Sequence, residues 1–124
     1  MVLVDTSVWV RFLAGREPFA SRLADLLQHD DVLAHDLVEG ELLIGDRGGW
    51  PRLLGTYGRI SRAQTLPHAD VIELVRSRNL HGRGIGWIDA HLLASALITH
   101  APLWTVDSSL AVMASELGIG YLAS

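Results

Sequence analysis

Short apolar segments alternate along this chain with longer segments of helical periodicity, and this alternation constrains the fold more than any other feature. The segments that we interpret as strands are residues 2–5, 32–34, 102–106 and 119–122, with an ambiguous edge strand at 60–66. The predicted helices are two short ones, one that ends near residue 14 and one at 50–57, and longer ones at 18–29, 36–45, 69–79, 88–99 and 108–117. Strands that alternate with helices predict a mostly parallel sheet covered on both faces. We therefore expect an α/β fold of three layers, in which helices flank a central, mostly parallel sheet of four to five strands.

The size and composition of the chain indicate one soluble domain. A length of 124 residues suits a single domain, residues 1–124, and a hydrophobic fraction of 49% is enough for a real core. No apolar run approaches the roughly 18 residues that a membrane span needs, and the chain begins directly with a strand-like segment rather than a basic targeting region. The absence of cysteine excludes disulfides, thiolate zinc sites and cysteine nucleophiles. We expect a cytoplasmic protein.

All ten basic residues are arginine, and the missing lysine excludes several classes of enzyme. P-loop nucleotide hydrolases, Schiff-base enzymes and lysine-dependent phosphotransfer domains each lose a required group. A net charge of −4 argues against a protein that binds nucleic acid through bulk positive charge. It leaves a nuclease possible, because bound cations can offset part of the negative charge.

Four acidic residues stand at the ends of apolar segments or within them. Asp5 and Asp107 each follow a predicted strand, Asp89 begins a predicted helix, and Glu41 lies inside another. Ligands of parallel sheets gather outside the carboxyl ends of the strands, so Asp5 and Asp107 should meet at one edge. Asp89 could face that edge, and Glu41 can join if its helix packs alongside. Carboxylates beside buried surface are costly unless something pairs with them, and in a chain without lysine this suggests a metal ion.

Oxygen ligands of this kind suit hard divalent cations such as Mg²⁺ and Mn²⁺. A cation there lowers the pKa of a bound water and stabilises charge on a phosphoryl group, so phosphodiester hydrolysis by activated water is the natural chemistry. Each acid also has a local interpretation. Asp5 and Asp107 could cap the helices that follow them, Asp89 could be a helix N-terminal acid favoured by the macrodipole, and Glu41 could be solvated.

Four segments of the sequence resemble the motifs of one family, the PIN domains of the VapC type. Val4–Trp9 resembles the start of such a domain, and Glu41–Gly45 is similar to its second motif. Gly86–Ala94 resembles the third motif and Leu103–Asp107 the fourth. The order and approximate spacing agree, and the resemblance covers essentially the whole chain.

This resemblance implies a function for the acidic residues. It implies the toxin of a toxin–antitoxin pair, a metal-dependent endoribonuclease that uses Mg²⁺, with Mn²⁺ able to substitute. It implies Asp5, Glu41, Asp89 and Asp107 as the catalytic and metal-binding acids, with Asp5 and Asp89 the principal metal ligands. Metal-activated water would attack the phosphodiester and leave a 5′-phosphate and a 3′-hydroxyl. It also implies an RNA substrate, a VapB-type antitoxin whose C-terminal segment blocks the site, and a homodimer.

Three hydroxyl residues are candidates to support these acids. Thr6, Ser7 and Thr105 could hydrogen-bond the carboxylates or metal-bound water, or could be ordinary turn and cap hydroxyls. Glu39 competes with Glu41 for the site, but the two point about 200° apart on a helix and cannot share a face. We favour Glu41 because its neighbours match the family motif.

Contacts to RNA are harder to assign from sequence. Arg11, Arg47 and Arg83 could bind phosphates or serve as surface charges. Trp9, Trp50, Trp87 and Trp104 could stack on bases or pack in the core, and His91 is a weaker candidate for an RNA contact. Two other functions stay open at this point. One is a catalytically silent PIN-like binding module, and the other is a receiver-like phosphoacceptor domain, which ordinarily needs a lysine.

Overall fold

A small parallel sheet lies at the centre of the protein. In the computed structural model, which describes residues 1–49 and 51–122, the strands are β1 (Val2–Val4), β2 (Val32–Leu33) and β3 (Leu103–Trp104). Their order is β2-β1-β3, and β1 runs parallel to both neighbours. All strand residues are apolar and buried, as is typical of a parallel sheet with both faces covered. The predicted parallel α/β fold is confirmed.

The two outer strands expected from the sequence are shorter than predicted. In the predicted strand 60–66, Arg62 forms a single parallel bridge with Ala34 beside β2. In the predicted strand 119–122, Gly120 forms a single parallel bridge with Leu103 of β3. Two backbone hydrogen bonds hold each segment to the sheet. Among the described residues the sheet therefore has three strands, and one further bridged segment lies along each edge.

Seven helices in the described part of the chain lie close to the predicted ranges. They are α1 (Thr6–Leu13), α2 (Phe19–Gln28), α3 (Asp36–Gly45), α4 (Pro51–Tyr57), α5 (His68–Ser77), α6 (Trp87–Thr99) and α7 (Ser108–Glu116). Trp50, the first residue of the helix predicted at 50–57, lies outside the described residues. No helix in residues 1–49 or 51–122 is long and apolar enough to cross a membrane.

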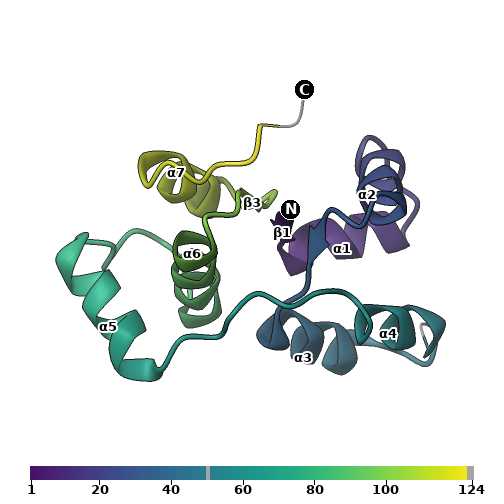
Figure 1. Cartoon of the computed structure of the whole chain (residues 1–124), viewed down its shortest axis with the longest axis horizontal. Helices are drawn as coiled ribbons and strands as arrows, with labels where there is room; N and C mark the ends of the chain where they lie inside the picture. The colour runs from purple at the N-terminus through teal and green to yellow at the C-terminus, as the bar shows by residue number, and fades with distance from the viewer. Residues whose placement is uncertain (50, 123–124) are drawn as a thin grey trace.

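Figure 1 shows α1 and α2 on one side of the sheet and α6 and α7 on the other, with α5 beyond α6. Helix α6 is almost apolar on every side, and its residues 90–96 are all buried. A helix that is apolar all round is expected to lie inside the protein. It does so here, because α6 contacts β3 on one side and α5 on the other. Trp9 and Trp104, possible base-stacking residues on sequence grounds, are core residues that are 0% and 5% exposed.

A polar network crosses this apolar core and joins α3, α4 and α6. His35 is fully buried at the N-cap of α3, where its Nδ1 accepts a hydrogen bond from the amide of Leu37 at 3.0 Å. That nitrogen therefore carries no proton, and the neutral ring donates from Nε2 to Ser95 Oγ at 2.9 Å. The amide of His35 donates to the Tyr57 hydroxyl at 2.8 Å. Burial lowers the pKa of His35, which keeps the ring neutral as this network requires.

We expect Ser95→Ala to lower the free energy of unfolding by about 1–3 kcal/mol, because the Nε2 proton of His35 would be buried without an acceptor. Urea denaturation followed by circular dichroism measures the loss. Ser77→Ala, which removes an exposed hydroxyl from α5, is the control and should change stability by less than about 0.5 kcal/mol. Equal stability of the two variants would show that the His35–Ser95 bond contributes nothing.

Candidate functional site

The ends of two neighbouring strands bring Asp5 and Asp107 to the same edge of the sheet. β1 ends at Val4, and Asp5 follows at once in the N-cap position of α1. β3 ends at Trp104, and Asp107 is the N-cap of α7. Because β1 and β3 are paired and parallel, their carboxyl ends lie side by side. The sequence therefore places these two acids at one edge through strand direction alone.

Asp5 is buried, 6% exposed, and two hydroxyl groups hold its carboxylate. Ser7 Oγ donates to Asp5 Oδ2 at 2.7 Å, and Thr105 Oγ1 donates to the same oxygen at 2.8 Å. Each hydroxyl has one proton and gives it to Asp5, so each is free to accept from another donor. Ser7 Oγ accepts from the amide of Val106 at 3.2 Å, and Thr105 Oγ1 from the amide of Asp107 at 3.1 Å.

These four hydrogen bonds, which we call the Asp5 clamp, form two relays from backbone amides through hydroxyls to one carboxylate oxygen. Such chains polarise one another and strengthen in a buried setting. They also fix the loop after β3 to the start of α1. Asp5 occupies the N-cap position, yet its side chain makes no cap hydrogen bond. The capping interpretation of Asp5 is therefore wrong, since the clamp takes up the side-chain oxygen instead.

Asp89 lies half-buried in the first turn of α6, close enough to the other three acids to feel their charges. Its Oδ2 accepts from the amide of Gly86 at 3.1 Å. Burial raises the pKa of Asp89 above its ordinary value, and the charges of Asp5, Asp107 and Glu41 raise it further, whereas the Gly86 amide opposes the rise. The four acids predicted from the sequence thus share one electrostatic neighbourhood.

Glu41 and Glu39 have separate partners, as their spacing on α3 requires. Glu41 is exposed, and its Oε1 accepts from Thr6 Oγ1 of α1 at 2.6 Å. Glu39 points elsewhere and forms an ion pair with Arg62 at 2.7 Å. Arg62 also pairs with Asp36 at 2.8 Å. Of these two glutamates, only Glu41 contacts α1, the helix that begins directly after Asp5.

Each of the four acids has one oxygen engaged by a protein donor. For Asp107 this is Oδ1, which accepts from the amide of Leu110 at 2.9 Å, so its helix-capping interpretation is correct. The second oxygens, Oδ1 of Asp5 and Asp89, Oδ2 of Asp107 and Oε2 of Glu41, accept no hydrogen bond from the residues described. Oxygen atoms of this type fit a hard divalent cation. No three His, Cys, Asp or Glu side chains in residues 1–49 and 51–122 stand grouped as a ready-made metal site.

Sequence reasoning missed the backbone donors at the site: the amides of Gly86 and Leu110 donate to Asp89 and Asp107, and the amide of Val106 donates to the Ser7 hydroxyl that holds Asp5. The glycine-rich loop before α6 is the one signal that could have pointed to Gly86, because backbone amides have no residue-type pattern.

Of the candidate arginines, Arg11 donates to the carbonyl of Ser7 at 2.9 Å and lies 5.8 Å from the Phe19 ring centroid. Arg83 forms an ion pair with Glu116 at 2.7 Å, and Arg47 is exposed.

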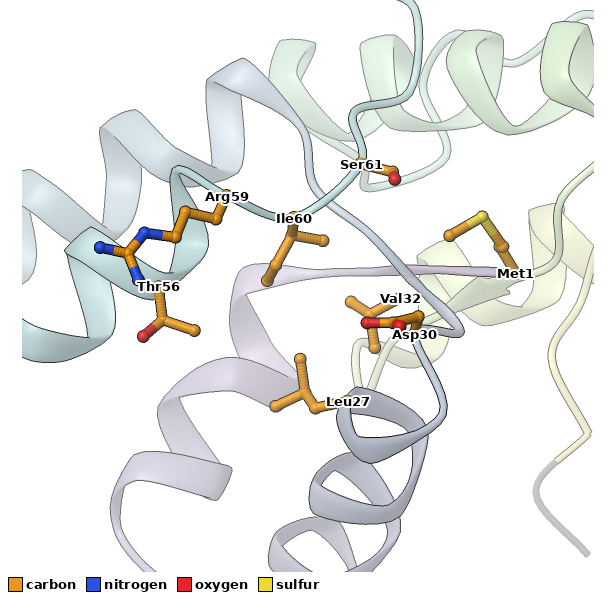
Figure 2. Close-up of a pocket in the computed structure, with 8 residues that line it drawn as sticks. All are labelled: Met1, Leu27, Asp30, Val32, Thr56, Arg59, Ile60 and Ser61. Atoms are coloured by element: carbon orange, nitrogen blue, oxygen red, sulfur yellow. The ribbon is translucent and has the colours of Figure 1, made fainter.

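A pocket of about 410 Å³ lies away from this edge of the sheet (Figure 2). Met1, which precedes β1, lines it, together with Asp30 before β2 and with Thr56, Arg59, Ile60 and Ser61. Because Met1 and Asp5 stand at opposite ends of β1, this pocket belongs to the amino end of the sheet. None of the four acids lines it.

Comparison with known proteins gives a consistent picture. The PIN domain family matches the chain over residues 2–116. The curated protein Ribonuclease VapC32 of Mycobacterium tuberculosis, from the strains CDC 1551 / Oshkosh and ATCC 25618 / H37Rv, is 38% identical over 120 residues. The aligned region covers 96% of this chain and 94% of that relative. The similarity therefore extends across all the segments that carry the four acids.

The raised pKa of Asp89 predicts how stability depends on pH. A carboxyl group whose pKa is higher in the folded state binds protons more tightly there, so its contribution to stability is present at low pH and is lost as the pH rises through that pKa. Asp89→Asn removes this loss and retains an oxygen that can accept from Gly86. With EDTA present, we expect the variant to be at least as stable as the parent at about pH 7, and its advantage to shrink towards about pH 4. Melting temperatures of both proteins across this range measure the effect, and an advantage that grows at low pH would contradict it.

Proposed function

Because the chain belongs to the PIN domain family, in its VapC group, we propose that it is the toxin of a toxin–antitoxin pair and cleaves RNA as a metal-dependent endoribonuclease. The observation that best supports this is that the four acids lie near one another, since the charges of Asp5, Asp107 and Glu41 add to the burial that raises the pKa of Asp89. Four carboxylates near the carboxyl edge of one sheet contribute little to folding, because like charges repel. They suit a site that receives a cation.

In this proposal Asp5, Glu41, Asp89 and Asp107 are the metal-binding and catalytic acids, and Asp5 and Asp89 are the principal ligands. The cation is Mg²⁺, for which Mn²⁺ can substitute. When bound, such a cation supplies a water of lowered pKa and offsets charge on the phosphoryl group.

The protein's own part is to hold the acids in place. Ser7 and Thr105 fix Asp5 Oδ2, which leaves Oδ1 for a ligand, and Thr6 orients Glu41. Supporting hydrogen bonds of this kind typically keep a carboxylate in the position that a metal requires.

We also propose that the protein is one cytoplasmic domain, residues 1–124, that it forms a homodimer, and that a VapB-type antitoxin binds it. Exposed apolar side chains beside the acids support a protein partner. Leu43 and Ile44 follow Glu41 on α3 and are 61% and 87% exposed. Val10, one turn after Thr6 on α1, is 45% exposed. Apolar exposure of this extent is common where proteins associate.

The proposed nuclease activity predicts a sharp contrast between two residues of α3. Purified protein should cleave single-stranded RNA with Mg²⁺ or Mn²⁺, and EDTA should stop it. Asp5→Asn and Asp89→Asn should lower the rate by at least about 100-fold, since even residues that only support a metal ligand cost about 10- to 100-fold. Glu41→Gln should also lower the rate. Glu39→Gln, the same change two positions away, should retain it, because Glu39 pairs with Arg62. Cleavage that persists in Asp5→Asn protein would refute the assignment.

The proposed metal site also predicts a stabilisation that is independent of activity. A ligand that binds only the folded state stabilises it by about 2.7 kcal/mol at 100 times its dissociation constant. Mn²⁺ titration should therefore raise the melting temperature of the parent and of Glu39→Gln, and raise that of Asp89→Asn much less. A silent PIN-like module would show no shift in the parent, and equal shifts in parent and Asp89→Asn would contradict the role of this acid.

A further inference from the structure

Trp87 is the one tryptophan among the described residues that presents its ring to solvent. It is the first residue of α6 and is 41% exposed, whereas Trp9 and Trp104 are 0% and 5% exposed. Exposure of a large aromatic side chain to water is unfavourable. An exposed aromatic ring near the candidate site therefore often marks a binding surface.

Two imidazole rings flank Trp87. The ring centroid of His68, the exposed first residue of α5, lies 5.1 Å from that of Trp87. The ring of His91, one turn further along α6, also lies 5.1 Å away and is nearly perpendicular, at 88°. His68, Trp87 and His91, which we call the aromatic platform, thus join the starts of α5 and α6.

His91 carries an unused hydrogen-bonding group within the platform. Its side chain is 8% exposed, and its Nδ1 is buried without a hydrogen-bond partner among the described residues. Buried polar atoms are normally paired, and an unpaired one costs free energy. Because this Nδ1 is buried, a ligand beside Trp87 would not reach it, and the surfaces that the platform offers to a ligand are the exposed rings of Trp87 and His68.

The surroundings of the platform favour a nucleobase over a protein surface. The other large hydrophobic side chains that are exposed in the described part of the chain lie on α1, α3 and α7, at Ile98 near the far end of α6, and at the termini. Among these exposed hydrophobic side chains Trp87 is the one flanked by two imidazole rings, whereas protein interfaces typically present contiguous apolar patches. Trp87 also lines a pocket of about 150 Å³ together with His81 and with the apolar residues Val75, Leu80, Ile85 and Ala90. Nucleobases combine a flat π-face with polar edges, which matches this arrangement.

The position of the platform relates it to the acid cluster. Trp87 and Asp89 both belong to the first turn of α6 and point to opposite sides of it, since two residues turn a helix by about 200°. An RNA strand with a phosphate at Asp89 would cross the end of α6 and bring an adjacent base to Trp87. The net charge of −4 gives the protein little bulk attraction for RNA, so stacking would supply a large share of the affinity.

We propose that His68, Trp87 and His91 form a stacking site for a nucleobase of single-stranded RNA next to the scissile phosphate, an inference that rests on the proposed nuclease function. Trp87 is the residue that touches the base. His68 and His91 pack against its ring, and the exposed His68 supplies a polar contact at the edge of the site.

The test measures RNA binding with EDTA present, so that it does not depend on cleavage. A single-stranded RNA oligonucleotide is titrated by fluorescence anisotropy into the full-length parent and its variants at low salt. Trp87→Leu should weaken binding about 5- to 100-fold, the range expected for one stacked base, whereas Trp87→Phe should retain most of the affinity. Ile98→Ala, which removes an exposed side chain from the other end of α6, is the control and should bind like the parent.

Two further readouts distinguish stacking from other roles of Trp87. RNA should quench the tryptophan fluorescence of the parent but not that of Trp87→Phe. An abasic oligonucleotide should bind the parent more weakly than intact RNA does, whereas Trp87→Leu should bind the two oligonucleotides with equal affinity. Equal RNA affinity of Trp87→Leu and Ile98→Ala would overturn the proposal. So would a loss of self-association in Trp87→Leu with RNA affinity intact, which would assign the ring to a protein interface.

If the parent cleaves RNA and Trp87→Leu binds RNA normally, only the stacking site fails. If the parent binds through Trp87 without cleaving, only the nuclease function fails.

Discussion

A buried carboxylate must be supplied with hydrogen-bond donors, and the way this chain supplies them to Asp5 organises the whole carboxyl edge of the sheet. Two hydroxyls share one oxygen of Asp5, and the amides of Val106 and Asp107 stand behind those hydroxyls. The same bonds that satisfy Asp5 therefore fix the loop after β3. Because that loop ends in Asp107, the position of a second acid follows from the needs of the first. Asp89 and Glu41 join the group through the starts of α6 and α1, with Gly86 and Thr6 as their donors.

Much of the fold could be predicted because its signals are local. The helix at 36–45 follows from apolar periodicity and a following break, and the structure gives it the same bounds. Strand lengths could not be predicted as well, since an apolar run does not tell how many of its residues find a partner. The segments around Arg62 and Gly120 each form a single bridge with the sheet rather than a full strand. The hydrogen bond between His35 and Ser95 could not be predicted either, because 60 positions separate the two residues and neither residue type indicates the other as its partner.

In the candidate site, too, the features set by local sequence could be predicted and those set by long-range contacts could not. Strand direction alone predicts that Asp5 and Asp107 share an edge, and helix geometry alone separates Glu41 from Glu39. The details that decide chemistry depend on long-range contacts. Thr105 meets Asp5 across 100 positions, and the backbone donors carry no pattern of residue types. The structure in turn separates the tryptophans, since Trp9 and Trp104 pack inside and Trp87 does not. Exposure of a large ring depends on what packs against it, which no single segment of sequence can tell.

The sequence separation within the Asp5 clamp has a consequence for synthesis of the protein. Asp5 is synthesised 100 positions before Thr105, and the amides of Val106 and Asp107 follow directly after Thr105. Contacts between distant parts of a chain form late, because the loop between them must close first. A nascent chain that has reached residue 100 contains the sequence of α6 and three of the four acids, but not the residues that hold Asp5. The Asp5 clamp can therefore form only after residues 105–107 have been synthesised, late in the synthesis of this domain.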